Sequence, residues 1–247
     1  MLNKRDIDYF NFGKIENKKF WKRLGGKPVL KDKSVLDFGC GHGALCVEIA
    51  QSGAKIVNGI DLEDELLKFA NDNLEINHQN LKDKIKFQKL NILENKIEQK
   101  FDLIVSKDTF EHTLNLRAVL KKMYSLLNVG GRAYIGFGPL YNFYNGDHGR
   151  TNMHLPWFHL LFSEKFIIDR VNKKNNLNIK RIEDLGLSKY SLKEYEDFFK
   201  NSDFKIKYYK TNESDHPVSL IFNVLSKFKF FREYCTYNIY CILEKSI

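Results

Sequence analysis

The chain has 247 residues, of which 43% are hydrophobic. That content excludes a disordered chain, and the length suits one folded domain. The net charge is +9, but lysine is spread along the chain and forms no dense basic tract, so the charge alone does not indicate a nucleic-acid-binding protein.

The sequence carries no signal for membrane insertion or export. It contains no run of about 18 apolar residues, which a membrane-spanning helix needs, and no apolar stretch follows the charges of the first six residues. The four cysteines, Cys40, Cys46, Cys235 and Cys241, form no C-x-x-C pair. We therefore expect a cytoplasmic protein with reduced thiols and no membrane span.

Strand and helix patterns alternate through the first 137 residues. One or two helices are expected within residues 1–30, and buried strands at 34–38, 55–61, 85–90, 101–105 and 133–137. A helix over about 113–127 is expected to end at Gly130-Gly131. This alternation predicts an α/β fold with a parallel sheet and helices on both faces.

The second half of the chain has a different pattern. Residues 138–162 are loop-like and aromatic, and helices are expected at about 163–173, 191–200 and 217–230. The helix at 191–200 begins with Ser191-x-x-Glu194, a capping-box pattern. Strands at 204–209 and 237–242 follow the last two helical patterns. We predict a single domain over residues 1–247, in which residues 138–200 form a lid that covers the substrate.

A glycine-rich turn follows the first predicted strand and has the sequence Asp37-x-Gly39-x-Gly41-x-Gly43. Glycines let a backbone turn tightly and lie close to a ligand, and the N-terminus of the next helix offers N–H donors. Asp61 ends the second predicted strand, where a carboxylate can accept hydrogen bonds from both hydroxyls of a ribose. Dinucleotide-binding enzymes share these two features.

Asn91-Ile92 after the third strand and Ser106 after the fourth complete a set that resembles class I S-adenosylmethionine-dependent methyltransferases. The resemblance covers residues 30–137 well. It implies a Rossmann-like, mostly parallel sheet of seven strands with a terminal antiparallel hairpin, and S-adenosylmethionine as the cofactor.

The same resemblance implies a role for each matching residue. Gly39, Gly41 and Gly43 would form the turn around the methionine part of the cofactor, and Asp37 would help to hold its ammonium group. Asp61 would bind the ribose. Three positions would surround the adenine: Leu62 would pack on the ring, while Asn91 and Ile92 would read its edge. Ser106 would line the methionine end.

Three candidate metal ligands, Asp108, Glu111 and His112, follow the fourth strand within one helical turn. They resemble the acidic-x-x-Glu-His metal site of some small-molecule and RNA 2′-O-methyltransferases, although here the first residue is aspartate. The expected ion would be a divalent metal such as Mg²⁺. The alternative is that Glu111 and His112 only begin the next helix.

Two histidines, His148 and His154, are candidates for the base that removes the proton of an acceptor hydroxyl, and Asp147 could orient one of them. Loops beyond the carboxyl ends of parallel strands line the ligand crevice. The alternative is that both are hydrogen-bonded lid histidines. The aromatic segment 138–162, which contains both histidines, resembles methyltransferases found with surface-polysaccharide (capsule or O-antigen) biosynthesis. His159 and His216 are left without a role.

The sequence thus predicts an S-adenosylmethionine-dependent O-methyltransferase whose substrate is a small carbohydrate. A nucleotide-linked or phosphorylated sugar, such as a heptose, would suit the positive charge. Three alternatives stay open: methylation of a small aromatic or quinone-like hydroxyl, methylation of RNA, and an inactive scaffold. Ser106-Lys107-Asp108-Thr109 departs from the [Asp/Asn]-Pro-Pro-[Tyr/Phe] pattern of enzymes that methylate base nitrogens, which argues against nucleic acid.

Overall fold

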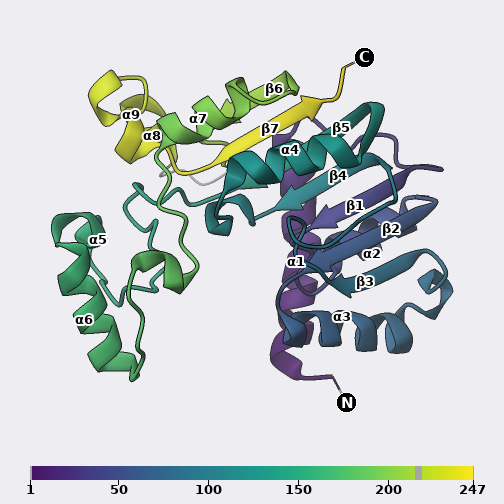
Figure 1. The fold of residues 1–247 in the computed structure, drawn as a ribbon, viewed down its shortest axis with the longest axis horizontal. Coiled ribbons are helices and arrows are strands. Elements are labelled where there is room, and N and C mark those ends of the chain that lie inside the picture. The colour runs from purple at the N-terminus through teal and green to yellow at the C-terminus, as the bar shows by residue number, and fades with distance from the viewer. Residues whose placement is uncertain (1, 215–218, 247) are drawn as a thin grey trace.

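The computed structural model describes residues 2–214 and 219–246. Its centre is one seven-stranded sheet in the order β3-β2-β1-β4-β5-β7-β6 (Figure 1). The first five strands pair in parallel, and β7 is antiparallel to both β5 and β6. This arrangement confirms the predicted fold, including its terminal hairpin. The strands are β1 (Ser34–Phe38), β2 (Ile56–Asp61), β3 (Ile85–Lys89), β4 (Phe101–Lys107), β5 (Leu127–Phe137), β6 (Lys205–Thr211) and β7 (Ile239–Glu244).

Helices cover both faces of the sheet because neighbouring strand residues point to opposite sides. Val35 of β1 packs in the core beneath α1 (Lys4–Arg23), α2 (Ala44–Gln51) and α3 (Asp64–Asn77). Leu36, the next residue, packs in the core beneath α4 (Leu116–Leu126) and α7 (Leu192–Lys200). The prediction of helices on both faces is confirmed.

The predicted role of Gly130-Gly131 as the end of the helix before β5 is wrong. Helix α4 ends at Leu126, and β5 already begins at Leu127. Gly130 has the positive φ of 77° expected of a glycine cap, but its N–H donates to the carbonyl of Lys245 just beyond β7. The two glycines therefore shape an irregular start of β5 rather than the end of a helix.

The connection from β5 to α7 includes a separate small unit, which we call the arm (residues 152–187). It contains α5 (Phe158–Leu161) and α6 (Glu164–Asn175), which Figure 1 shows extending to one side of the sheet. The arm has its own core of Ile167, Val171, Ile182 and Leu187. Helix α7, by contrast, packs on the sheet, so the last part of segment 138–200 belongs to the main body. The Ser191–Glu194 capping box that begins α7 is confirmed.

Two short helices, α8 (Ser219–Leu225) and α9 (Lys229–Cys235), replace the single helix expected at 217–230. Residues 217 and 218 lie outside the described residues. The two helices form a hairpin between β6 and β7. None of the helices in the described part of the chain combines the length and hydropathy that crossing a bilayer requires.

Candidate active site

The glycine turn lies at the carboxyl end of β1, where the strand order of the sheet reverses and α/β folds bind their ligands. Gly39 and Gly41 have φ angles of 79° and 48°, a region that favours glycine. A side chain at Gly39 would collide with Thr109, whereas nothing lies within 4 Å of the point where a side chain at Gly41 would begin. Gly41 therefore borders open space beside the N-terminus of α2.

Asp61, at the end of β2, lies beside this open space. Its Oδ2 accepts a hydrogen bond of 2.8 Å from the Gly41 N–H. Its Oδ1 accepts from the N–H groups of Leu62 and Glu63 at 2.7 and 3.1 Å. Because a carboxylate offers about four acceptor positions, Asp61 can still accept from a ligand. Leu62, next to it, is exposed.

Asn91 and Ile92, after β3, already have local structural roles. The Asn91 side-chain oxygen accepts from the Leu93 N–H at 3.0 Å, and the Asn91 N–H donates to Asn95 Oδ1 at 2.9 Å. These bonds close the turn that follows β3. Ile92 is buried in the core that contains Leu36. Contact of either residue with an adenine stays a prediction.

Asp37 and Ser106 are both buried next to the glycine turn. The Cys46 thiol donates to Asp37 Oδ2 at 3.1 Å, and the Ser106 hydroxyl donates to the Phe38 carbonyl at 2.9 Å. Burial raises the pKa of Asp37 to about 7, against the hydrogen bond from Cys46 and the charge of Lys107. Contact of Asp37 or Ser106 with the methionine part of a cofactor stays a prediction.

Helix α1 covers the glycine turn, a feature that the sequence analysis missed. The His42 ring lies 4.6 Å from the ring of Tyr9 and 5.2 Å from that of Phe69, measured between centroids. Its Nε2 lies 3.3 Å from Asp6 Oδ1. The buried Nδ1 of His42 has no hydrogen-bond partner among the described residues. The covered turn, its open space and this unused nitrogen all fit a polar ligand.

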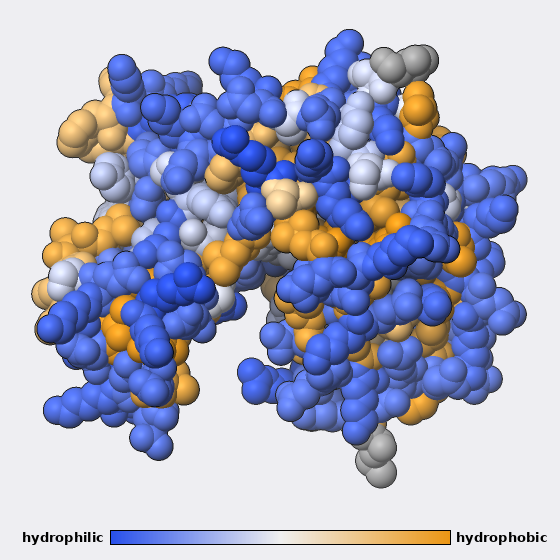
Figure 2. All heavy atoms as spheres, viewed as in Figure 1, coloured by the Kyte–Doolittle hydropathy of each residue, from blue (hydrophilic) through white to orange (hydrophobic). Residues whose placement is uncertain are grey.

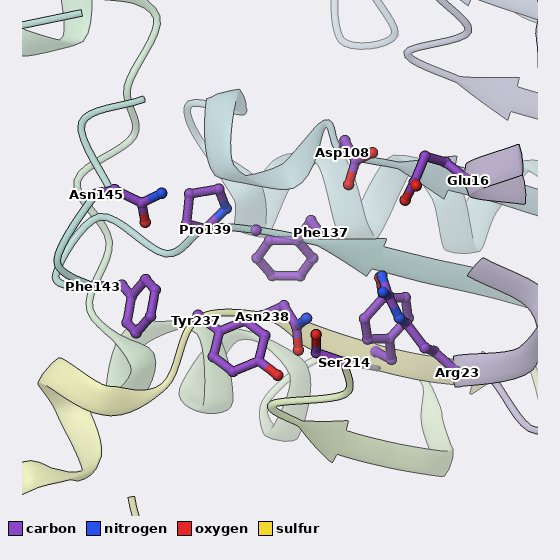
Figure 3. Close-up of a pocket in the computed structure, with 12 residues that line it drawn as sticks. Glu16, Arg23, Asp108, Phe137, Pro139, Phe143, Asn145, Ser214, Tyr237 and Asn238 are labelled. Carbon is purple, nitrogen blue, oxygen red and sulfur yellow. The ribbon is translucent and has the colours of Figure 1, made fainter. Parts of the chain in front are cut away.

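A cavity of about 310 Å³ lies where β4 and β5 end and β7 begins (Figure 3). Asp108 follows β4, and Figure 3 shows the Glu16 carboxyl on the same side of the cavity, with Arg23 below them. Arg23 Nη1 donates to the Tyr240 hydroxyl at 2.9 Å. The complete lining is Glu16, Arg23, Asp108, Phe137, Gly138, Pro139, Phe143, Asn145, Ser214, Tyr237, Asn238 and Tyr240.

Asp108 is accessible to solvent through this cavity. The surrounding protein nevertheless raises the pKa of its carboxyl above the ordinary range, mainly through burial; Lys107 and Arg23 oppose the rise, and Glu16 adds to it. An accessible carboxylate with a raised pKa is a stronger base than an ordinary aspartate. Asp108 is therefore suited to accept a proton inside the cavity.

The predicted metal ligands Asp108, Glu111 and His112 do not converge. The short 3-10 helix Phe110–His112 turns Glu111 inward, where its Oε1 accepts from the Gly138 N–H at 3.3 Å. His112 Nδ1 instead lies 2.6 Å from the Gly186 carbonyl, to which it donates. Among residues 2–214 and 219–246, no group of three or more histidine, cysteine, aspartate or glutamate side chains could hold a metal ion. The role of these three residues as metal ligands stays a prediction.

His148 lies next to the cavity without lining it. Its Nε2 donates to the Pro139 carbonyl at 3.1 Å, and its ring lies 4.9 Å from that of His112. Burial lowers the pKa of His148, against the hydrogen bond to Pro139, so the ring is neutral at pH 7 and Nδ1 keeps its lone pair. His148 can act as the predicted base only if the substrate extends beyond Pro139, which lines the cavity, to reach its ring.

His154 lies on the arm and lines a second cavity, of about 330 Å³. The residues of that cavity, from Asn152 to Arg170, share none with the cavity at the strand ends. His154 therefore does not line the cavity at the strand ends, and its role as a base stays a prediction. His159 Nε2 donates to the Tyr141 carbonyl at 2.7 Å and is buried. His216 lies outside the described residues.

The chain resembles known methyltransferases in sequence and in fold. Residues 30–137 match a family described as "Methyltransferase domain". The ubiquinone biosynthesis O-methyltransferase of Coxiella burnetii is 35% identical over 105 residues, which are 42% of this chain and 43% of that protein. The chain therefore matches less than half the length of this curated relative.

Two solved structures share the fold at low sequence identity. A putative S-adenosylmethionine-dependent methyltransferase from Listeria monocytogenes has a TM-score of 0.59 and 19% identity, over 94% of this chain and 100% of that one. An O-methyltransferase of Brevibacillus brevis in complex with S-adenosylhomocysteine has a TM-score of 0.58 and 15% identity, over 94% and 72%. Residues 30–137 thus match a methyltransferase domain, and the whole chain shares the fold of these S-adenosylmethionine-dependent methyltransferases.

Proposed function

We propose that this chain is an S-adenosylmethionine-dependent O-methyltransferase that methylates a hydroxyl group of a polar, carbohydrate-like small molecule. The observation that carries the proposal is the polar lining of the cavity at the strand ends, where Glu16, Arg23 and Asp108 meet. Carbohydrates present many hydroxyls that such side chains can bind through hydrogen bonds. The glycine turn next to this cavity is the proposed cofactor site.

The residues around the glycine turn fit the cofactor. The free acceptor positions of Asp61 suit the two ribose hydroxyls, and the open space at Gly41 lets a ligand approach the backbone. When bound, S-adenosylmethionine supplies a methyl group that is already activated by its sulfonium. The protein then has three tasks: to exclude water, to align the acceptor, and to remove its proton. Alignment alone can lower the barrier by several kcal/mol, about 7–11 at best.

Asp108 is the proposed base of the reaction, in place of His148 and His154. Its carboxylate faces the cavity, so it can take the proton of an acceptor hydroxyl as the oxygen attacks the methyl group. Arg23 and Tyr240, which are hydrogen-bonded to each other, would bind neighbouring hydroxyls of the acceptor.

The charges in the cavity favour an acceptor group without phosphate. Two carboxyls, Glu16 and Asp108, face one guanidinium, Arg23, so an anion placed between them would be repelled more than attracted. We infer that the methylated sugar ring is uncharged or carries an amino group. A nucleotide or phosphate attached to it, as the net charge of +9 suggested, would have to lie outside the cavity. A place in capsule or O-antigen assembly stays a prediction.

A quinone-like or other aromatic hydroxyl is the second candidate acceptor. The name of the Coxiella burnetii relative favours it, as do the aromatic side chains Phe137, Phe143 and Tyr237 in the cavity. The polar groups opposite them favour the carbohydrate.

Mass spectrometry after incubation with S-adenosylmethionine would test the proposal. The panel would contain neutral and amino sugars, their nucleotide-linked forms, and catechols with and without a prenyl tail. We expect a gain of one methylene unit on a sugar, and the yield should be lower in Asp61→Asn when S-adenosylmethionine is not saturating. A chelator should leave the yield unchanged, because the predicted metal ligands point to separate partners.

Methylation of catechols alone would overturn the carbohydrate assignment and leave the methyltransferase assignment intact. If the protein binds neither S-adenosylmethionine nor S-adenosylhomocysteine, the whole proposal fails. An RNA acceptor would instead show itself by an affinity for RNA that falls steeply with salt.

A further inference from the structure

The hairpin of α8 and α9 presents a large apolar surface to solvent. Phe230 is 78% exposed and Leu220 66% exposed, although both are side chains that proteins usually bury. They belong to a run of exposed apolar residues within residues 219–235, namely Leu220, Ile221, Val224, Phe228, Phe230, Phe231 and Tyr234. Figure 2 shows apolar residues at the edge of the molecule where Figure 1 places α9.

This surface is not the one that attaches the hairpin to the rest of the chain. Phe222, on the other side of α8, makes that attachment. Its ring lies 4.8 Å from that of Phe143 and stacks on that of Tyr144 at 5.8 Å. The exposed apolar side chains therefore take no part in packing the hairpin against the rest of the protein. Exposed apolar patches of this kind mark sites that bind a protein, a ligand or a membrane.

The charges on the hairpin select among these partners. Lys227 and Lys229 are exposed and form no ion pair with any described residue. Arg232 is paired with Glu196, and Glu233 accepts hydrogen bonds from the body of the protein. The charges left to a partner are therefore positive, in a chain with a net charge of +9.

We propose that the α8–α9 hairpin binds the surface of an anionic lipid membrane. Aromatic and aliphatic side chains together with lysines are typical of helices that lie in the membrane interface. The negative potential of anionic lipids attracts each lysine near the surface. A second copy of the chain fits less well, because a two-fold interface through this patch would bring Lys227 and Lys229 of both copies together without a facing carboxylate.

Membrane binding would also position the cavity at the strand ends. Ser214 and Tyr237, two of its lining residues, lie shortly before and after the hairpin in the chain. A docked hairpin would hold this cavity close to the lipid surface, where an acceptor attached to a lipid could reach it. The docking itself does not depend on which reaction the cavity performs.

Vesicle flotation with the full chain would test the proposal. We expect the protein to float with vesicles that contain phosphatidylglycerol and to float poorly with pure phosphatidylcholine. Raising the salt from about 0.1 M to about 0.5 M should release it, since screening shortens the reach of the lysine charges. Analytical ultracentrifugation of the same protein without vesicles would measure its oligomeric state in solution.

Two sets of variants separate the apolar part from the charged part. Leu220→Ser with Phe230→Ser should lower vesicle partitioning at least about tenfold, because each buried apolar side chain favours binding. Lys227→Gln with Lys229→Gln should remove the preference for anionic vesicles. Val29→Ser with Val129→Ser, at residues 77% and 63% exposed outside the hairpin, is the matched control and should bind as the wild type does.

Three results would overturn the inference. One is a wild-type protein that binds neither kind of vesicle. Another is that Leu220→Ser with Phe230→Ser binds vesicles as tightly as the control variant does, while both keep the wild-type melting temperature. The third is a dimer in solution that Leu220→Ser with Phe230→Ser dissociates while vesicles are not bound, which would assign the surface to a second copy of the chain.

Discussion

The Asp61 carboxylate accepts a hydrogen bond of 2.8 Å from the backbone N–H of Gly41. This bond joins the end of β2 to the turn that follows β1. The other oxygen of Asp61 accepts from the N–H groups of Leu62 and Glu63, just before α3 begins. One carboxylate therefore fixes two neighbouring loops around the open space at Gly41, so its loss should affect ligand binding at both.

Replacing Asp61 by asparagine should weaken binding of S-adenosylhomocysteine about tenfold to a hundredfold. The amide can accept only on one side, and a hydrogen bond to a charged group contributes about 1.5–3 kcal/mol. Isothermal titration calorimetry measures the change. Asp64→Asn is the matched control, because Asp64 is an exposed aspartate that pairs with Lys89 on the surface. Equal affinity in both variants would remove Asp61 from the proposed cofactor site.

Substitutions in the cavity should change acceptor binding and leave cofactor binding intact. Arg23→Gln and Glu16→Gln each remove a charge from the cavity wall while keeping a similar size. We expect the KM for a sugar acceptor to rise about tenfold in either variant, with the affinity for S-adenosylhomocysteine unchanged. Arg170→Gln, in the cavity of the arm, is the control. A rise in KM only for Arg170→Gln would place the acceptor on the arm instead.

Local patterns in the sequence predict most of the sheet. Alternation of buried strands and amphipathic helices suffices for β1 to β5, because each of these elements is determined by its own residues. The errors arise where a residue has a tertiary role. Gly130 has the geometry of a helix cap but pairs with Lys245, 115 residues later in the chain. No local pattern contains that contact.

The candidate site divides in the same way. The glycine turn and Asp61 are adjacent because parallel strands end at the same edge of a sheet, and the sequence predicts that adjacency. Glu16 and Arg23 reach the cavity from α1, and Asn238 reaches it from the other end of the chain. Their sequence surroundings carry no signal of a site. The predicted metal ligands show the limit of close spacing in sequence: Glu111 and His112 are neighbours in one 3-10 helix, but their side chains bond to different partners.

Asp108→Asn should lower kcat and change its dependence on pH. Asp108 accepts a proton only when it is ionised, and its pKa is raised above the ordinary range. Activity of the wild type should therefore fall as the pH drops through that raised pKa, at a higher pH than for an exposed aspartate. The asparagine variant should lose this acid limb and about 100-fold to 10,000-fold in kcat. Single-turnover rates from pH 5 to pH 9 measure both effects.

His148→Ala serves as the comparison for the same rates. Since His148 lies next to the cavity and does not line it, we expect a much smaller loss of kcat and an unchanged acid limb. If His148→Ala loses the acid limb and Asp108→Asn keeps it, the role of base passes to His148.

Asp37→Asn should make the stability of the ligand-free protein less dependent on pH. Burial raises the pKa of Asp37 from 3.8 to about 7, so the folded state holds a proton that the unfolded state has released at intermediate pH. The stabilisation from this proton is fully present below about pH 4 and is lost as the pH rises through about 7, a change of about 4 kcal/mol.

The free energy of unfolding in urea at pH 5 and pH 8 tests this linkage. The wild type should lose several kcal/mol between the two values, whereas Asp37→Asn should lose less, because a neutral amide holds the same position at both. Asp72→Asn, at an exposed position on α3, should behave as the wild type does. Equal losses in all three proteins would mean that the Asp37 carboxyl is ionised in the folded protein at pH 5. Because no cofactor is bound in this experiment, the charge of Lys107, which already opposes the rise in the pKa of Asp37, would then have to stabilise the buried carboxylate.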